Sequence, residues 1–119
     1  MQYLLLIYGT ESNAPDPASP VMAAAMKEYG EFTQAINESG NFKGGNRLRP
    51  ASDATSVRVR DGKTLLTDGP FAETAEQLGG YYLIEAPNLD DAIAIGARIP
   101  GAKWGTIEVR PVWAMPSPA

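Results

Sequence analysis

The sequence predicts an α+β domain in which strands and helices alternate around one inserted β-hairpin. Three observations support this fold class. Residues 2–8 and 80–86 are apolar at nearly every position, which is typical of strands covered on both faces of a sheet. Two further segments, 20–39 and 89–99, carry apolar residues at helical spacing. Asp61-Gly62 separates two β-favouring runs, which is the strongest short-range signal for a hairpin.

The first half of the chain is predicted to form a strand over 2–8, a loop over 9–19 and a helix. Ser19 is the expected N-cap, and Pro20 suits the first helical position because its missing N–H has no partner there. Gly40 is the expected stop, since glycine readily adopts the left-handed conformation after a last helical turn. The residues expected to face the core are Met22, Ala25, Met26, Tyr29, Phe32, Thr33 and Ile36.

The middle of the chain is predicted to contain a short irregular strand within 41–50 and a hairpin over 55–67. A two-residue turn sets the register of this hairpin. It pairs Arg60 with Lys63, Val59 with Thr64 and Val57 with Leu66. Because cross-strand partners share a face, Val57, Val59 and Leu66 lie together, with Arg58 and Arg60 on the opposite face.

The last part of the chain is predicted to be a strand over 80–86, a second helix and a strand over 104–112. Asn88 is the expected N-cap of the helix and Pro100-Gly101 its end. Its predicted inner stripe is Leu89, Ala92, Ile93, Gly96 and Ala97. A single domain over residues 1–113 is expected, with 114–119 as a disordered tail.

Without the hairpin, the order of elements is βαββαβ, the split βαβ arrangement. The two doubly apolar strands, 2–8 and 80–86, then lie at the centre of the sheet, where we expect them to be parallel. Two helices cover only one face of such a sheet, so the other face keeps many apolar side chains. An uncovered patch of several hundred Å² is usually an interface, and we therefore predict a two-fold homodimer with facing sheets.

Composition excludes several classes of chemistry. The chain has 119 residues, no cysteine and no histidine, which removes thiolate chemistry, the usual general base and the commonest transition-metal ligand. No metal or other cofactor is expected. The net charge is −4 without a basic run, so direct nucleic-acid binding is not expected. The longest apolar run, 4–7, is too short for a membrane span or signal peptide, and a cytoplasmic protein is predicted.

The segment 67–82 carries a resemblance to a known family. Asp68-Gly69-Pro70-Phe71 is the tetrapeptide typical of the DGPF-type branch of the YCII-related proteins. Residues 3–9 and 105–112 also resemble the ends of that family, so the resemblance spans residues 2–112. It implies a ferredoxin-like domain that forms a dimeric α/β barrel, and a functional link to an alternative sigma factor. Related YCII proteins carry a helix histidine paired with an aspartate, and a chain without histidine cannot form that pair.

The same segment provides the candidate site residues. Asp68 and Glu73 are the candidate catalytic carboxylates, and Phe71, Tyr81 or Tyr82 could desolvate Asp68 and raise its pKa. Phe71, Tyr81 and Arg49 are the candidate ligand-binding residues, with Arg49 supplying a cation for an anionic ligand. The reading that these residues favour assigns Asp68 to a turn instead, in which its carboxylate accepts a hydrogen bond from the backbone two residues on.

Arg58, Arg60 and Arg110 could also supply such a cation, but each has an ordinary structural reading. Arg58 and Arg60 are expected at the surface of the hairpin. Arg110 alternates with Glu108 and is interpreted as part of a cross-strand charge ladder.

Three functions are consistent with these residues. The favoured hypothesis is a regulatory dimer that binds a small molecule or a protein partner, because no histidine, cysteine or metal cluster is present. The alternative is a histidine-free acid–base enzyme, a lyase, isomerase or hydrolase acting on a small organic acid. A purely structural dimer is the third.

Overall fold

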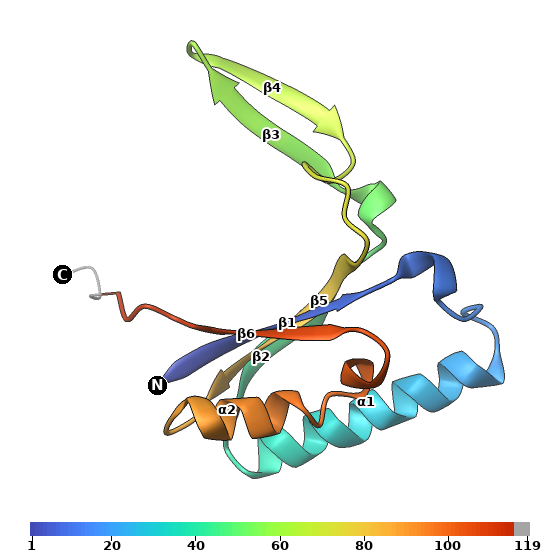
Figure 1. Cartoon of the computed structure of the whole chain (residues 1–119), viewed down its shortest axis with the longest axis vertical. Coiled ribbons are helices and arrows are strands. Elements are labelled where there is room, and N and C mark those ends of the chain that lie inside the picture. The colour runs from blue at the N-terminus through green and yellow to red at the C-terminus, as the bar shows by residue number, and fades with distance from the viewer. Residues whose placement is uncertain (116–119) are drawn as a thin grey trace.

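The computed structural model describes residues 1–115, which form a layer of two helices, a four-stranded sheet and a separate two-stranded hairpin (Figure 1). The sheet contains β1 (Gln2–Gly9), β2 (Phe42–Arg47), β5 (Gln77–Glu85) and β6 (Thr106–Pro111) in the order β2-β5-β1-β6. The hairpin contains β3 (Thr55–Arg60) and β4 (Lys63–Asp68), and the helices are α1 (Pro20–Glu38) and α2 (Leu89–Gly96). Three short 3-10 helices complete the chain: η1 (Glu11–Asn13), η2 (Ala51–Asp53) and η3 (Pro100–Lys103). This is the predicted α+β, ferredoxin-like fold, and the sheet of the single chain is open.

The two central strands are β1 and β5, as predicted, but they run antiparallel. The prediction that they are parallel was wrong. Both β2 and β1 pair antiparallel with β5, so β2 runs in the same direction as β1 after the return through α1. The excursion through the hairpin then brings the chain back beside β2 in the opposite direction, and every pairing in the sheet becomes antiparallel.

Both helices begin at the predicted caps. The Ser19 side chain accepts from the Met22 N–H at 3.2 Å, and the Asn88 side chain accepts from the Asp91 N–H at 2.9 Å. Gly40 takes a positive φ of 81° just after α1, as expected for a helix stop. Helix α1 turns its predicted stripe inward, although Met26 remains 39% exposed.

Helix α2 differs from its prediction in length and in orientation. It ends at Gly96, and Pro100 begins η3 instead of terminating α2. Its buried residues are Ala92, Ile95 and Gly96, whereas the predicted inner residues Leu89 and Ile93 are about half exposed. With only eight residues, the helix offers several apolar positions on either side, and packing against the sheet decides which of them is buried.

The core lies between the helices and the sheet. It contains Tyr3, Leu5, Phe32, Ile36, Tyr82, Ile84, Ala86, Ala92, Ile95 and Ile99. The rings of Phe32 and Tyr82 meet edge to face with centroids 5.2 Å apart, a favoured aromatic geometry. Because the Thr33 hydroxyl donates to the Tyr29 carbonyl, it must accept from the Tyr82 hydroxyl, which lies 2.6 Å away. The polar end of Tyr82 is thereby satisfied inside the core.

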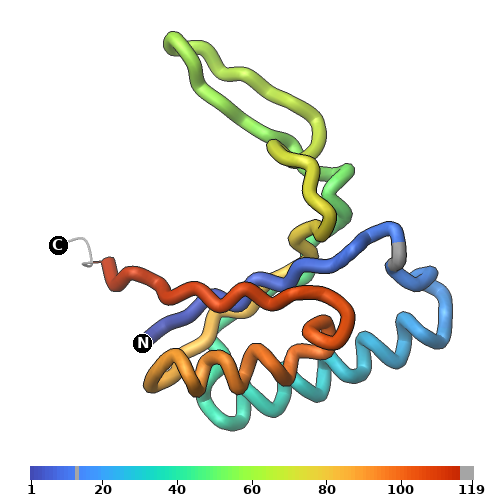
Figure 2. The backbone as a smooth tube through the Cα atoms, in the orientation of Figure 1, coloured from blue at the N-terminus to red at the C-terminus, as the bar shows by residue number. Residues whose placement is uncertain are grey.

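The hairpin has the predicted register, with Arg60 opposite Lys63, Val59 opposite Thr64 and Val57 opposite Leu66. Asp61 and Gly62 both have positive φ, as a type I′ turn requires. The hairpin lies on the side of the sheet opposite the helices (Figures 1 and 2). Every residue of β4 is exposed. The predicted disordered tail, 114–119, lies mostly outside the described residues.

Candidate functional site

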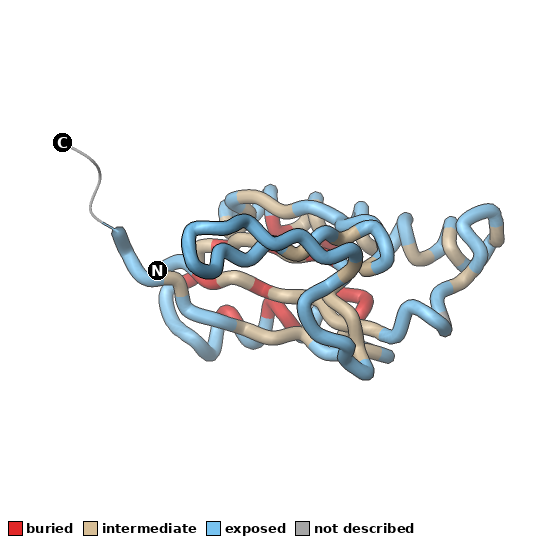
Figure 3. Tube along the Cα trace, turned by 90° about the horizontal axis from the view of Figure 1, so that it is seen from above, coloured by how far each residue is buried: buried red, intermediate tan, exposed pale blue. Residues whose placement is uncertain are grey.

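The face of the sheet that the helices do not cover is called here the open face. Strand alternation places Leu4 and Leu6 of β1 and Leu83 of β5 at its centre, and all three are only partly buried. Figure 3, viewed from the hairpin side, shows buried and intermediate positions alternating along the strands beneath the hairpin. The centre of this face is therefore apolar and only partly covered in the single chain.

Polar side chains flank this apolar centre in one row across the sheet. The strand registers place Asn46, Tyr81, Leu6 and Glu108 side by side on β2, β5, β1 and β6. Asn46 Nδ2 donates to the Tyr81 hydroxyl at 2.8 Å. The open face therefore offers a tyrosine hydroxyl and an amide on one side of the leucines and a carboxylate on the other.

A charged pair occupies the β6 end of the open face. Arg110 Nη2 lies 2.6 Å from Glu108 Oε2, and the Arg110 side chain is 67% exposed. Glu108 Oε2 is shielded from water yet makes no hydrogen bond of regular geometry, so its contact with Arg110 is an ion pair alone. The predicted cross-strand charge ladder was wrong, because the β1 neighbours of Glu108 and Arg110 are Leu6 and Leu4.

The two candidate carboxylates lie away from this face. Asp68 is the last residue of β4 and Glu73 lies in the following loop, and both are exposed. Neither side chain makes a hydrogen bond or ion pair within residues 1–115. In the single chain, the two carboxylates therefore face water.

The turn after β4 is fixed by glycine backbone and not by the Asp68 side chain. Gly69 has a φ of 92°, a conformation that side-chain-bearing residues rarely adopt. Its N–H donates to the Ala54 carbonyl at 2.6 Å, and its own carbonyl accepts from the Ser56 hydroxyl at 2.8 Å. The hydrogen bond that the turn reading assigned to the Asp68 carboxylate is not formed among the described residues.

The three candidate ligand-binding residues are also separated. Arg49 pairs with Asp53 at 2.8 Å in the loop after β2, and Phe71 is 80% exposed in the loop after the hairpin. Tyr81 alone lies on the open face. The sequence analysis missed Asn46, because its strand has a register shift between Phe42 and Gly44 that no local pattern indicates.

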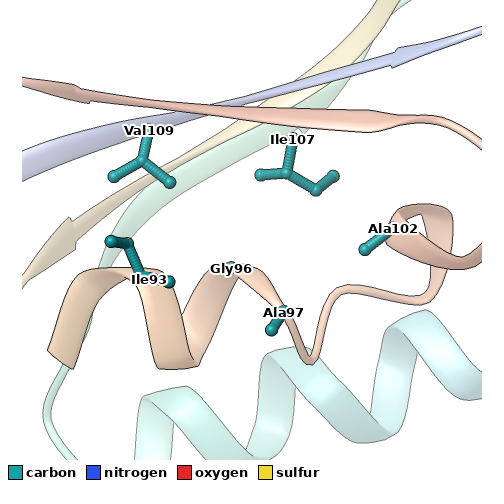
Figure 4. A pocket seen from close by; sticks show the side chains of 6 residues that line it. All are labelled: Ile93, Gly96, Ala97, Ala102, Ile107 and Val109. Carbon is teal, nitrogen blue, oxygen red and sulfur yellow. The ribbon is translucent and has the colours of Figure 1, made fainter. Parts of the chain in front are cut away.

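The described surface includes two shallow depressions. One, of about 280 Å³, is lined by residues 47–50 and includes Arg49. The other, of about 290 Å³, lies between α2 and β6 and is lined by residues with apolar side chains and by one glycine (Figure 4). Neither contains Asp68, Glu73 or Tyr81. No group of three acidic residues that could hold a metal ion occurs within residues 1–115.

Beneath the sheet, Tyr29 is the described side chain with a clearly perturbed pKa. Burial raises the pKa of its hydroxyl above the ordinary value of 10.0, and a hydrogen bond from the Gly101 N–H, at 3.1 Å, opposes part of this rise. The hydroxyl stays protonated at neutral pH and acts there as a structural acceptor.

Neither described helix has the length and apolar character to cross a membrane.

Comparison with known proteins supports the resemblance noted in the sequence. Residues 1–116 match the YCII-related domain. The chain is also 34% identical, over 114 residues, to an uncharacterized protein of Rhizobium meliloti (strain 1021). That alignment covers 94% of this chain and 92% of the relative, so the two proteins match along nearly their whole length.

Proposed function

This chain belongs to the YCII-related family, and we propose that it is a homodimer that binds a small organic anion between two facing sheets. The observation that carries the proposal is the open face, on which Tyr81, Asn46 and Arg110 surround the partly buried leucines 4, 6 and 83. The motif Asp68-Gly69-Pro70-Phe71 supports placing the chain in the DGPF-type branch. A dimer that responds to a small organic anion suits a regulatory role, and the resemblance implies a functional link to an alternative sigma factor.

The dimer follows from the uncovered apolar surface. Both helices pack on the same side of the sheet, so no helix of residues 1–115 packs over Leu4, Leu6 and Leu83, and all three stay partly accessible to solvent. A self-complementary patch of this kind is typically buried by a second copy across a two-fold axis. Facing sheets pack about 10 Å apart, which leaves room for side chains and a small ligand where residues are short, as at Gly44.

The ligand class follows from the polar groups. Arginine presents a planar fork of donors that matches a carboxylate, and Arg110 is the arginine on the open face. A ligand carboxylate would compete with Glu108 for this guanidinium, while Tyr81 and Asn46 offer hydrogen bonds to a second polar group of the ligand. The leucines between them suit an apolar carbon skeleton.

The geometry favours binding over turnover. An acid–base mechanism needs two carboxylates held in defined and unlike environments. Asp68 and Glu73 are exposed and have no hydrogen-bond partner among the described residues, so nothing in the chain orients them toward each other.

The test is a thermal-shift screen with small aliphatic and aromatic mono- and dicarboxylates. A probe present at about 100 times its dissociation constant should stabilise the protein by about 2.7 kcal/mol. That corresponds to a rise in Tm on the order of 10 °C for a domain of this size. Arg110→Gln should abolish the shift, whereas Arg58→Gln, on the hairpin, should preserve it. Shifts of equal size in Arg110→Gln and the wild type, or none with any probe, would contradict the proposal.

A further inference from the structure

The hairpin carries an exposed apolar stripe that its own chain does not cover. Val57 and Val59 are 60% and 59% exposed, and Leu66 is 68% exposed. The register places all three on one face, together with Asp68. A two-stranded hairpin alone is marginally stable in water, and it needs another surface against its apolar face.

An apolar groove of matching character lies between α2 and β6 (Figure 4). Its lining residues are Ile93, Gly96, Ala97, Ala102, Ile107 and Val109. The small residues Gly96 and Ala97 of α2 leave room for this groove. Ile93, which was predicted to face the core, lies at the groove and is 49% exposed. The groove is on the opposite side of the sheet from the hairpin of the same chain, so that hairpin cannot fill it.

The hairpin of a second copy can reach this groove. Arg47, Gly80, Ile7 and Ile107 form one row across the sheet, so the chain leaves β2 toward the hairpin at the same end of the sheet where the groove begins. A two-fold axis parallel to the strands places the β2 edge of one copy opposite the β6 edge of the other. Six residues per strand give the hairpin a length of roughly 20 Å, against about 10 Å between facing sheets. The hairpin therefore extends past the sheet of the second copy to its helix layer.

The two faces of the hairpin differ in character. Arg58, Arg60 and Lys63 lie on the hairpin face opposite the apolar stripe. When the stripe packs against a second copy, these charged side chains stay on the water-facing side, so the packing desolvates none of them.

This inference rests on the proposed dimer. We infer that the β3–β4 hairpin is an exchange arm, a segment that each copy extends onto the other, and that its Val57, Val59 and Leu66 pack into the α2–β6 groove of the second copy. This arrangement covers the stripe, the groove and the unpaired edge of β6 in one interface. Asp68 shares the stripe's face, so its carboxylate moves from water to the boundary between the two copies. Each arm then contributes a carboxylate to the interface between the two chains.

The arm is tested by disulfide cross-linking, which has no background because the chain contains no cysteine. The double variant Val59→Cys/Ile93→Cys pairs the stripe with the groove, and Arg58→Cys/Ile93→Cys is the matched control on the opposite face of the hairpin. After mild oxidation, the first variant should run mainly as a reducible covalent dimer, and the control should form several-fold less. Val57→Cys/Ala102→Cys provides a second pair in case the first variant folds poorly.

Light scattering on the same samples separates the two proposals. A protein that is dimeric by mass but forms no stripe-specific cross-link in either pair overturns the arm and leaves the facing-sheet dimer standing. Equal cross-linking of stripe and control variants also overturns the arm. A monomeric wild type overturns both proposals.

Discussion

The segment Asp68-Gly69-Pro70-Phe71 divides its roles between two residues. Gly69 makes the turn, because its positive φ and two backbone hydrogen bonds fix the exit from β4. Asp68 makes no hydrogen bond among the described residues and is exposed, so the turn does not explain why a carboxylate stands there. In the proposed exchange arm, Asp68 would lie at the boundary between two copies, where a carboxylate next to an apolar stripe restricts which polar groups can face it.

The sequence predicted correctly the residues that act on nearby backbone, but not which distant side chains come together in the fold. The caps Ser19 and Asn88 and the turn Asp61-Gly62 were all correct because each acts on backbone within three residues. The candidate site residues Asp68, Glu73 and Arg49 do not meet in the single chain, because where loop residues lie depends on contacts distant in sequence. Asn46 joined Tyr81 only through the irregular pairing of β2.

At this scale, Tyr29 gives a pH-dependent prediction. The pKa of its hydroxyl is raised in the folded protein by burial, so the folded state holds the proton more tightly than the unfolded chain, whose tyrosines ionise near pH 10.0. The free energy of unfolding should therefore be unaffected by this group below pH 10.0 and fall as pH rises through the folded-state pKa.

Tyr29→Phe provides the comparison. It leaves the buried Gly101 N–H without its acceptor and should lower the free energy of unfolding by about 1–3 kcal/mol at neutral pH. Because the variant lacks the ionising hydroxyl, its stability difference from the wild type should narrow in alkaline solution. Urea unfolding across the alkaline range measures this, and a difference that stays constant would show that Tyr29 does not titrate as described.

At the scale of elements, predictions succeeded where one pattern fixed the outcome. The hairpin register followed from a two-residue turn, and the centrality of β1 and β5 followed from their doubly apolar sequences. The predicted direction of β5 was wrong, and the predicted inner face of α2 was right only at Ala92 and Gly96, because both depend on how elements pack. Eight residues with apolar side chains around most of the helix do not specify which side is buried.

Two adjacent glycines of β2 test the sheet as an element. A Cβ on Gly45 would lie 2.7 Å from the Tyr81 carbonyl oxygen and 3.1 Å from the Tyr82 ring, whereas one on Gly44 would meet nothing within 4 Å. Gly45→Ala should therefore destabilise the protein by about 1–3 kcal/mol through overpacking. Gly44→Ala should change stability by less than about 1 kcal/mol. Denaturant midpoints of the two variants compare them directly, and equal effects would mean that β2 does not pack against β5 in this register.

At the scale of the whole molecule, the fold leaves one layer incomplete. The helices and sheet form two layers with their core between them, and the open face and the hairpin on the other side have no third layer in the chain. The sequence already indicated this, because two helices cannot cover both faces of a sheet whose central strands are apolar on both. The groove beside α2 was not foreseeable, since it depends on the rotation of that helix.

The facing-sheet dimer is the central claim, and sedimentation equilibrium at micromolar concentration tests it most directly. The wild type should sediment at twice the 12.7 kDa mass of the chain. Leu6→Lys places a charge in the middle of the interface and should shift the mass toward that of one chain. Ala24→Lys, on the exposed face of α1, should leave the dimer intact. A wild type that sediments as a stable 12.7 kDa monomer would contradict the account.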